Sequence, residues 1–392
     1  MRKSIYFFGI DCDKVIVRSL AETLKKDFGK KLTLLSGPRQ VGKTTLARSL
    51  NPGCTYYNYD FLEDRRAILK HQWDMNAPLV LDELHKHARW KLWLKGLYDT
   101  GHLPKRTLVT GSARMNTFRR AGDSLAGRFF HHTLLPIDPK EGLKLLPSLS
   151  AVEVLERIMN VSGFPEPFFN GGVPDYRRWR SSLLDVILKQ DLLELESVRS
   201  LSDIQNLFLL LIEKVGGLLS YQSLCEDLSK SDKTIRNWVE ILENSYLFFR
   251  VYPLGVAATS IKKMPKLYLF DLPRVEDEAA RFENCVALAV YKEVLHQNEA
   301  LGQNLQLRFL RNKQKQEIDF AILDGKQVTH LIEVKLSDPV PSENFKHYGR
   351  LFPKAKKVQV VYHLERGFAH PGGVNVVPAA DFLVNLDLSR SR

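Results

Sequence analysis

The chain has 392 residues, of which 44% are hydrophobic and 26% charged. This composition excludes a disordered, collagenous or coiled-coil chain, and at about 100–200 residues per domain the length predicts two or three domains. The four cysteines are scattered without a C-x-x-C pair, so no zinc site or disulfide framework is expected, and a reducing cytoplasm fits. The apolar stretch near the start is interrupted by Asp11 and Asp13, and no later run approaches the ~18 apolar residues of a membrane helix. We therefore expect a cytoplasmic protein with no membrane span.

The net charge of +12 is concentrated in one part of the chain. Residues 1–150 hold 26 Lys and Arg against 14 Asp and Glu, whereas residues 151–270 and 271–392 are close to neutral. A basic domain attracts polyanions, of which nucleic acid is the commonest. The charge therefore favours DNA as a partner. The alternative is a solubilising surface with a few cations for a nucleotide.

The first third of the chain alternates apolar strands with helices, which predicts a parallel α/β sheet. The expected strands are Lys31–Ser36, Pro78–Leu81 and Arg106–Thr110, and a helix is expected over Thr44–Leu50. A proline-punctuated connector, Leu134–Ser150, follows, and residues 151–200 have a helical pattern.

Residues 218–253 have a different pattern, in which two short helices precede a strand. Ser220 can cap a helix through Leu228, and Asp232 can cap a second helix through Asn244. The apolar positions of the second helix recur at steps of three and four residues: Ile235, Trp238, Val239 and Leu242. With a strand over Tyr246–Tyr252, this order is the outline of a winged helix.

The last part of the chain mixes one helix with several strands. The helix is expected around Ala279–Leu295, and the strands near Leu305–Leu310, Glu317–Leu323, Val328–Lys335 and Lys357–His363. The predicted fold is therefore α/β with four parts: a P-loop core over residues 1–150, a helical lid over 151–200, a winged helix over 201–270 and a mixed α/β domain over 271–392.

One segment matches the phosphate-binding pattern G-x-x-x-x-G-K-[ST] between a strand and a helix start. Its glycines let the backbone N–H groups point at phosphate oxygens, and the helix N-terminus adds partial positive charge. Lys43 would reach the β- and γ-phosphates of ATP, and Thr44 would ligate Mg²⁺. The expected nucleotide-binding residues are Gly37, Pro38, Arg39, Gln40, Val41, Gly42, Lys43, Thr44 and Thr45.

A second apolar strand ends in two acids, Asp82 and Glu83. We expect Asp82 to hold Mg²⁺ and Glu83 to polarise the attacking water. The alternative is that both acids only open the following helix. Together with the phosphate loop, they predict a nucleotide hydrolase.

These motifs resemble those of AAA+ ATPases, in particular a prokaryotic subfamily that pairs the ATPase with a C-terminal domain of poorly defined function. The strand Thr107–Thr110 resembles the sensor strand, with Ser112 near the γ-phosphate, and the segment Ser124–Arg128 resembles the one that carries an arginine finger. The resemblance implies that Arg128 enters the site of a neighbouring subunit. A local salt bridge or a polynucleotide contact is the alternative for Arg128. The residues that compete for the finger role are Arg114, Arg119 and Arg120.

A family motif is also similar to the segment Gly163–Glu166, although no sensor-two arginine can be placed.

A charged hairpin supplies the other chemical signal. Glu333 and Lys335 are two residues apart on a strand and so share a face. A turn of only Asp324 and Gly325 would make Asp319 face away from Glu333. A three-residue loop or one bulge would instead move Asp319 opposite Leu331 and onto the shared face.

Two carboxylates and a lysine on one face could hold Mg²⁺ and orient a water at a phosphodiester. This pattern resembles the core of the PD-(D/E)XK nucleases, in which Asp319 and Glu333 would be metal ligands and Lys335 catalytic. Glu283, on the preceding helix, matches a helix glutamate of many members. An ordinary charged hairpin and a decayed, binding-only nuclease fold are the alternatives.

The combined expectation is a ring-forming ATPase, hexameric by resemblance, that uses ATP and Mg²⁺ to remodel DNA. Branch migration of junction DNA is the specific guess, by analogy with AAA+ motors that carry winged helices. One alternative is a Mg²⁺-dependent endonuclease gated by the ATPase, and another is a nucleotide-switched scaffold.

Overall fold

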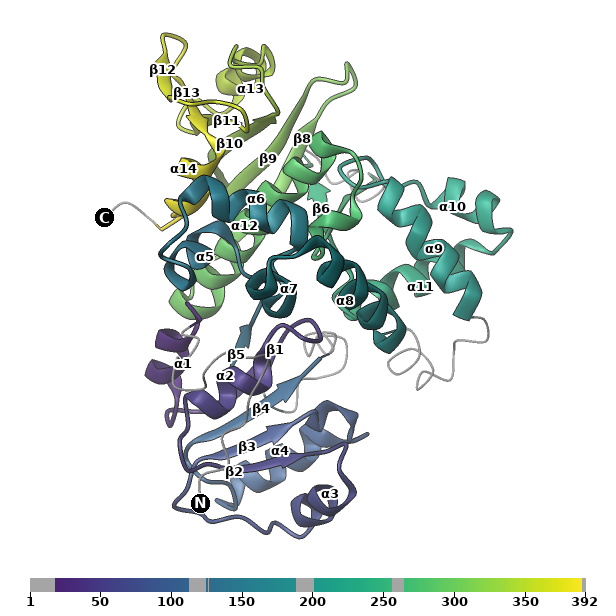
Figure 1. The fold of residues 1–392 in the computed structure, drawn as a ribbon, viewed down its shortest axis with the longest axis vertical. Coiled ribbons are helices and arrows are strands. Elements are labelled where there is room, and N and C mark those ends of the chain that lie inside the picture. Colours follow the sequence, from purple (N-terminus) through teal and green to yellow (C-terminus); the bar gives the residue numbers. More distant parts are fainter. Residues whose placement is uncertain (1–17, 113–124, 126, 188–200, 256–263, 390–392) are drawn as a thin grey trace. The chain divides into compact units, whose positions relative to one another are not determined.

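The computed structural model describes residues 18–112, 125, 127–187, 201–255 and 264–389 (Figure 1). The chain forms two compact units: an N-terminal unit of residues 1–136, to which 244–246 are assigned, and a C-terminal unit of 137–243 and 247–392. Within the described ranges, no helix is both long and apolar enough to cross a membrane.

The N-terminal unit is built on a five-stranded parallel sheet in the order β2-β3-β4-β1-β5. Its strands are β1 Leu32–Ser36, β2 Thr55–Asn58, β3 Leu79–Asp82, β4 Thr107–Gly111 and β5 Phe129–Thr133. Its helices are α1 Ala21–Asp27, α2 Lys43–Ser49, α3 Leu62–Leu69, α4 Trp90–Asp99 and the short η1 Leu84–Lys86. Strand β4 lies between β1 and β3, so the carboxyl ends of these three strands meet at one edge of the sheet.

Apolar side chains explain why this sheet is the centre of the unit. Strands β1, β3 and β4 are buried along their whole length. Helix α4 presents Trp90, Leu94 and Leu97 to the core that contains Leu81 and Val109. A strand without an exposed face is typical of a parallel sheet covered by helices.

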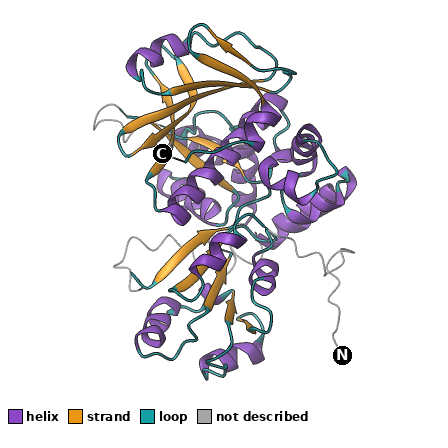
Figure 2. Ribbon diagram, turned by 90° about the vertical axis from the view of Figure 1, so that its left-hand side faces the viewer, coloured by secondary structure: helices purple, strands orange, loops and turns teal. Residues whose placement is uncertain are grey.

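The C-terminal unit contains an eight-stranded mixed sheet in the order β12-β13-β11-β10-β9-β8-β6-β7. Figure 2 shows these strands together with the helices of the unit. The strands are β6 Phe248–Pro253, β7 Lys266–Leu269, β8 Leu305–Arg311, β9 Glu317–Asp324, β10 Gln327–Lys335, β11 Lys356–Val361, β12 Phe368–His370 and β13 Val374–Pro378.

The helices before β6 are α5 Pro139–Leu145, α6 Ala151–Val161, α7 Pro165–Asn170, α8 Val173–Val186, α9 Leu201–Glu213, α10 Tyr221–Leu228 and α11 Asp232–Asn244. Those that follow are η5 Leu272–Arg274, α12 Glu278–Leu301, α13 Asn344–Leu351 and α14 Ala379–Val384.

Helix α12 is fixed to the sheet by a buried amide. The Asn284 side chain accepts a hydrogen bond from Leu269 N–H at 2.7 Å and donates one to Leu269 C=O at 2.8 Å. It thereby pairs with both backbone groups of a residue in β7. This contact holds the adjacent Glu283 beside β7.

The structure divides the chain differently from the four segments expected from the sequence. The first boundary falls after Pro136 rather than at residue 150, and residues 137–392 form one unit apart from 244–246. The reason is that β6, from the segment expected to be a winged helix, pairs in parallel with β8 of the last segment. Helix α6, from the expected lid, also packs against α12.

The expected connector Leu134–Ser150 contains helix α5. Asp138 caps it by accepting a hydrogen bond from Glu141 N–H at 2.8 Å, and Pro139 follows the cap. Proline is favoured at the first position of a helix because its missing N–H would have no partner there. The proline therefore starts a helix instead of ending one.

The helix–turn–helix–strand order of residues 220–253 is present. Ser220 caps α10, which ends at Leu228, and the four apolar positions expected in α11 are buried. Asp232 is the first residue of α11 rather than its cap, and Ser231 Oγ accepts the N–H of Thr234. Strands β6 and β7 pair antiparallel, and residues 256–263 between them lie outside the described residues.

Candidate functional site

The phosphate loop connects the end of β1 to the start of α2. Gly37 has a φ of +149° and Gly42 a φ of +96°, values that L-amino acids rarely adopt. A Cβ on Gly37 would lie 2.1 Å from the carbonyl oxygen of Leu134. Arg18, itself buried, donates to the carbonyls of Val41 and Leu135 at 2.8 and 2.6 Å. The shape of the loop is thus fixed by glycine and by a buried cation.

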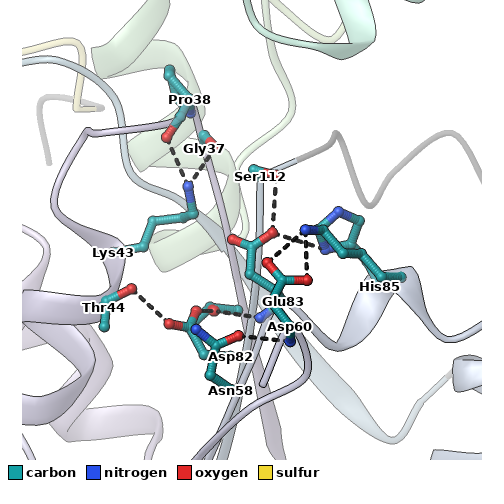
Figure 3. Close-up of polar contacts among 12 residues, drawn as sticks. Gly37, Pro38, Lys43, Thr44, Asn58, Asp60, Asp82, Glu83, His85 and Ser112 are labelled. Atoms are coloured by element: carbon teal, nitrogen blue, oxygen red, sulfur yellow. Dashed lines mark hydrogen bonds and ion pairs between the residues drawn. The ribbon is translucent and has the colours of Figure 1, made fainter. Parts of the chain in front are cut away.

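Lys43 lies across this loop. The residue is only 6% exposed, and its Nζ donates to the carbonyl oxygens of Gly37 and Pro38 at 2.9 and 2.7 Å (Figure 3). Of the other expected nucleotide-binding residues, Val41 is buried and Gln40 and Thr45 are exposed. The ammonium group is therefore held at the inner side of the loop, next to the N-terminus of α2.

The Asp82 carboxylate accepts hydrogen bonds from hydroxyl groups of three different elements. Thr44 of α2 and Tyr56 of β2 each donate to its Oδ2 at 2.7 Å, and Thr110 of β4 donates to its Oδ1. The aspartate is 3% exposed, and a buried carboxylate requires such partners. A hydroxyl and a carboxylate in contact at the N-terminus of α2 are oxygen ligands of the kind that Mg²⁺ takes. The residues present therefore fit the expected metal ion.

Glu83 follows Asp82 with a φ of +56°. For a residue other than glycine this is a strained conformation, of a kind that clusters at functional sites. Its Oε2 accepts a hydrogen bond from Ser112 Oγ at 3.2 Å and lies 3.8 Å from His85 Nδ1 (Figure 3). The structure thus brings Ser112 to Glu83 as the strand order requires, since β4 is the neighbour of β3.

Tyr56 is a site residue that the sequence did not identify. Burial and the charge of Asp82 raise its pKa, so the phenol stays a donor to that carboxylate. The Arg48 guanidinium lies 4.9 Å from its ring centre. The register that places β2 beside β3 is not visible in the sequence.

Arg128 forms an ion pair within its own chain. Its Nε and Nη2 lie 2.6 and 3.1 Å from the two carboxylate oxygens of Asp99, and both side chains are partly exposed. The Arg128 guanidinium lowers the pKa of Asp99 below its ordinary range. This contact corresponds to the local salt bridge left open above. The competing arginines 114, 119 and 120 lie outside the described residues.

The segment expected to resemble a sensor motif is packed against the start of the C-terminal unit. The carbonyl of Gly163 accepts a hydrogen bond from Ile137 N–H at 2.7 Å. A Cβ at Gly163 would lie 2.2 Å from the carbonyl oxygen of Ile137. This close approach of two backbones explains the glycine.

In the C-terminal hairpin, the register of β9 and β10 contains a bulge between Val328 and His330. Ile332 then pairs with Phe320, so the next pair of residues in this register is Asp319 and Glu333. The expected bulge is present, but Asp319 lies opposite Glu333 rather than Leu331. The two carboxylates share a face, and Asp319 Oδ2 accepts Val334 N–H at 2.9 Å.

Lys335 is the partner of Glu333, with its Nζ 2.9 Å from Oε1. The Glu333 side chain is buried, and among the described residues its Oε2 has no hydrogen-bond partner. Burial and the nearby charge of Asp319 raise the pKa of Glu333 to about 7.

A buried lysine that the sequence did not identify, Lys266, lies among carboxylates of α12 and β9. Lys266 Nζ lies 3.1 Å from Glu283 Oε1, 2.6 Å from Glu317 Oε1 and 3.6 Å from Asp319 Oδ1. Burial and the charge of Asp319 raise the pKa of Glu283 to about 7, against the opposing effect of Lys266. In the described part of the chain, no three His, Cys, Asp or Glu side chains are grouped so that they could hold a metal ion. The expected convergence of Glu283, Asp319 and Glu333 on one Mg²⁺-sized space is therefore not found.

Three family models match successive parts of the chain. Residues 29–143 match a family described as "AAA domain". Residues 152–272 and 281–382 match two families described as "Domain of unknown function", DUF8612 and DUF4143. The last two matches assign no activity to the C-terminal unit.

The chain is also similar to other proteins and to solved structures. Uncharacterized protein Rv2008c of Mycobacterium tuberculosis is 25% identical over an alignment of 392 positions. The alignment covers 95% of this chain and 86% of the relative. Uncharacterized protein MJ1637 of Methanocaldococcus jannaschii is 25% identical, with coverage of 62% and 61%. A variant of Thermotoga maritima RuvB is 18% identical, covers 59% of this chain and 87% of its own, and has a TM-score of 0.32.

The parallel sheet, the phosphate loop and the family match over residues 29–143 support an AAA-type ATPase domain in the N-terminal unit.

Gly37→Ala tests the shape of the loop. We expect it to lose most nucleotide affinity, because the added Cβ cannot fit against the backbone of Leu134. The measurement is binding of a fluorescent ATP analogue. Gly96→Ala is the control, since a Cβ at this position in α4 meets nothing within 4 Å and the change should stabilise the helix by up to about 1 kcal/mol. Equal nucleotide affinity in both variants would contradict the assignment.

Proposed function

We propose that the protein hydrolyses ATP in its N-terminal unit and uses the hydrolysis to act on DNA as a homo-oligomer. The observation that carries the first part is the contact of Thr44 with Asp82, beside the strained Glu83. A phosphate loop, a metal-binding pair and a general base are the parts that such hydrolysis requires.

Each residue has a role that follows from its position. The backbone of the loop and the N-terminus of α2 bind phosphate oxygens, and Lys43 adds a full positive charge. Thr44 and Asp82 would hold Mg²⁺, which neutralises the charge of the phosphates when bound. Tyr56 and Thr110 orient Asp82, because each donates a hydrogen bond to it.

Glu83 is the group that accepts a proton from the attacking water. Its carboxylate is oriented by the hydroxyl of Ser112 at 3.2 Å, and its position is set by the conformation at the end of β3. A carboxylate held in this way favours one direction of attack.

Glu83→Gln should bind ATP and fail to hydrolyse it, because the amide cannot accept the proton. Lys43→Ala should lose hydrolysis through weakened phosphate binding. Phosphate release and ATP binding, measured separately, distinguish the two variants. Glu63→Gln, which changes an exposed acid at the start of α3, is the matched control and should keep normal turnover. Turnover at the wild-type rate in Glu83→Gln would contradict the mechanism.

We further propose that Arg128 acts in the active site of the neighbouring subunit of a ring, a hexamer by resemblance. An arginine at the transferred phosphate stabilises the charge of the transition state, worth about 10³–10⁵ in rate in analogous systems. The pair with Asp99 is partly exposed, and exposed ion pairs contribute little to stability. The arginine can therefore leave Asp99 at low cost.

Arg128→Ala and Asp99→Asn distinguish a role of Arg128 in the neighbouring subunit from a structural role within its own chain. If Arg128 acts in the next subunit, Arg128→Ala loses most turnover while Asp99→Asn retains it. Mixing Arg128→Ala with Lys43→Ala should also restore activity, since some interfaces then combine an intact Lys43 with an intact Arg128. Equal losses in Arg128→Ala and Asp99→Asn, without recovery on mixing, would show that the arginine is a local structural partner.

The proposal of DNA as the partner is supported by the charge of residues 1–150. This segment contains 26 Lys and Arg residues and 14 Asp and Glu residues. The order of α10, α11 and the β6–β7 pair, which has the outline of a winged helix, also supports it. Remodelling of junction DNA by branch migration is the specific form that we propose. The presence of both Asp82 and Glu83 argues against a scaffold that binds nucleotide without hydrolysis.

DNA affinity should fall steeply with salt, because Lys and Arg displace counterions from the phosphates. A protein that makes about 6–10 phosphate contacts loses ~10³–10⁵ in affinity between 50 and 200 mM salt. Titrations of duplex, single-stranded and four-way DNA across this range measure the slope. An affinity that does not change with salt would point to a different partner.

A Mg²⁺-dependent nuclease gated by the ATPase is the second candidate. The observation that favours it is that Asp319 and Glu333 lie on one face of the hairpin, with Lys335 beside Glu333. The position of Lys266 bears directly on this candidate.

A further inference from the structure

We propose that the carboxylate cluster of the C-terminal unit takes the ammonium group of Lys266 in place of a divalent metal ion. The cluster consists of Glu283, Glu317, Asp319 and Glu333, and it contains the acids whose pattern resembles the Mg²⁺ site of the PD-(D/E)XK nucleases. The C-terminal unit then lacks metal-dependent cleavage. This inference does not depend on the proposed ATPase function.

The ammonium group is placed among the carboxylates as a bound cation would be. Its three acidic partners come from two elements, Glu283 from α12 and Glu317 and Asp319 from β9. The Lys266 residue is 3% exposed. Its Nζ also lies 5.7 Å from the ring centre of Phe309, a distance at which the ring attracts a cation.

The backbone of Lys266 is paired on both sides, which keeps its side chain in this place. Lys266 pairs with Val251 of β6 on one side and forms an isolated bridge with Leu218 on the other. Gly216, two residues before Leu218, would bring a Cβ to within 3.5 Å of the Glu283 carboxylate. The loop after α9 therefore packs directly beside the cluster.

Each carboxylate of the cluster already has at least one oxygen in contact with a donor of this chain. Glu283 Oε1 accepts Tyr268 O–H at 2.7 Å in addition to Lys266. Asp319 Oδ2 accepts a backbone N–H, and Arg311 pairs with Glu317. In the described structure, Glu333 Oε2 is the carboxylate oxygen of the cluster that is buried without a hydrogen-bond partner.

The charge of the cluster is also largely compensated. The cluster contains four carboxylates, and Lys266, Lys335 and Arg311 form ion pairs with them. Burial alone would lower the pKa of Lys266, but the charges of Glu283, Asp319 and Glu317 together raise it above its ordinary value. The lysine therefore keeps its proton, and a divalent ion would have to enter beside a fixed positive charge.

The test is a count of bound Mn²⁺ on the full chain with saturating ADP, by equilibrium dialysis and electron paramagnetic resonance. We expect the wild type to bind only the Mn²⁺ that accompanies ADP. Lys266→Gln should bind one more, because it frees the carboxylates. Lys266→Arg, which keeps the charge, and Lys335→Gln, which removes the more exposed lysine, should both match the wild type. The difference between Lys266→Gln and wild type stays at one even if ADP binding fails, so the two proposals are tested separately.

A second Mn²⁺ on the wild type that Asp319→Asn removes would overturn the inference. So would Mg²⁺-dependent DNA cleavage by the wild type that Asp319→Asn abolishes while ATP hydrolysis continues. Should Lys266→Gln fail to fold, these two measurements on the wild type still decide the question. If the wild type shows neither the second ion nor the cleavage, the result supports the inference that Lys266 takes the place of the metal ion.

Discussion

The buried carboxylate of Asp82 is the constraint around which the N-terminal site is organised. A carboxylate at 3% exposure is costly unless donors surround it, and its donors are the hydroxyls of Thr44, Tyr56 and Thr110. They come from α2, β2 and β4, so satisfying one side chain fixes the phosphate loop and two strands relative to β3. The same contacts set the place where a metal ion and the base Glu83 would act.

The C-terminal unit also buries carboxylates, but it compensates them mainly with cationic side chains. Its carboxylates come from α12, β9 and β10, and Tyr268 donates a hydroxyl hydrogen bond to one of them. The ammonium group of Lys266 supplies the compensation, together with Arg311 and Lys335. Removing one partner of such a buried ionic group is strongly destabilising, because it leaves an uncompensated charge. A lysine that links α12 to β7 and β9 therefore gives the unit a fixed geometry without a metal ion.

Those features of the fold that depend on local sequence could be predicted, and those that depend on pairing between distant segments could not. The phosphate loop, the acids after β3 and the apolar face of α11 are local patterns, and the structure has them where they were expected. Tyr56 contacts Asp82 of the neighbouring strand β3, and Lys266 contacts Glu317 of β9. Both partners lie more than 20 residues away along the chain. The exact pairing of Asp319 depended on a bulge whose position no local signal gives.

If the protein couples ATP hydrolysis to DNA as proposed, the two sites limit how that coupling can occur. A ligand shifts a conformational equilibrium only by its differential affinity for the two states, so ATP can do work on DNA only if its phosphates change contacts that also affect DNA binding. The Ser112–Glu83 hydrogen bond lies at the catalytic end of β4, and it is a contact that a γ-phosphate would compete for. The ionic contacts of Lys266 join elements of the C-terminal unit alone. The nucleotide-sensitive contacts are thus expected around Ser112 and Glu83, in the N-terminal unit.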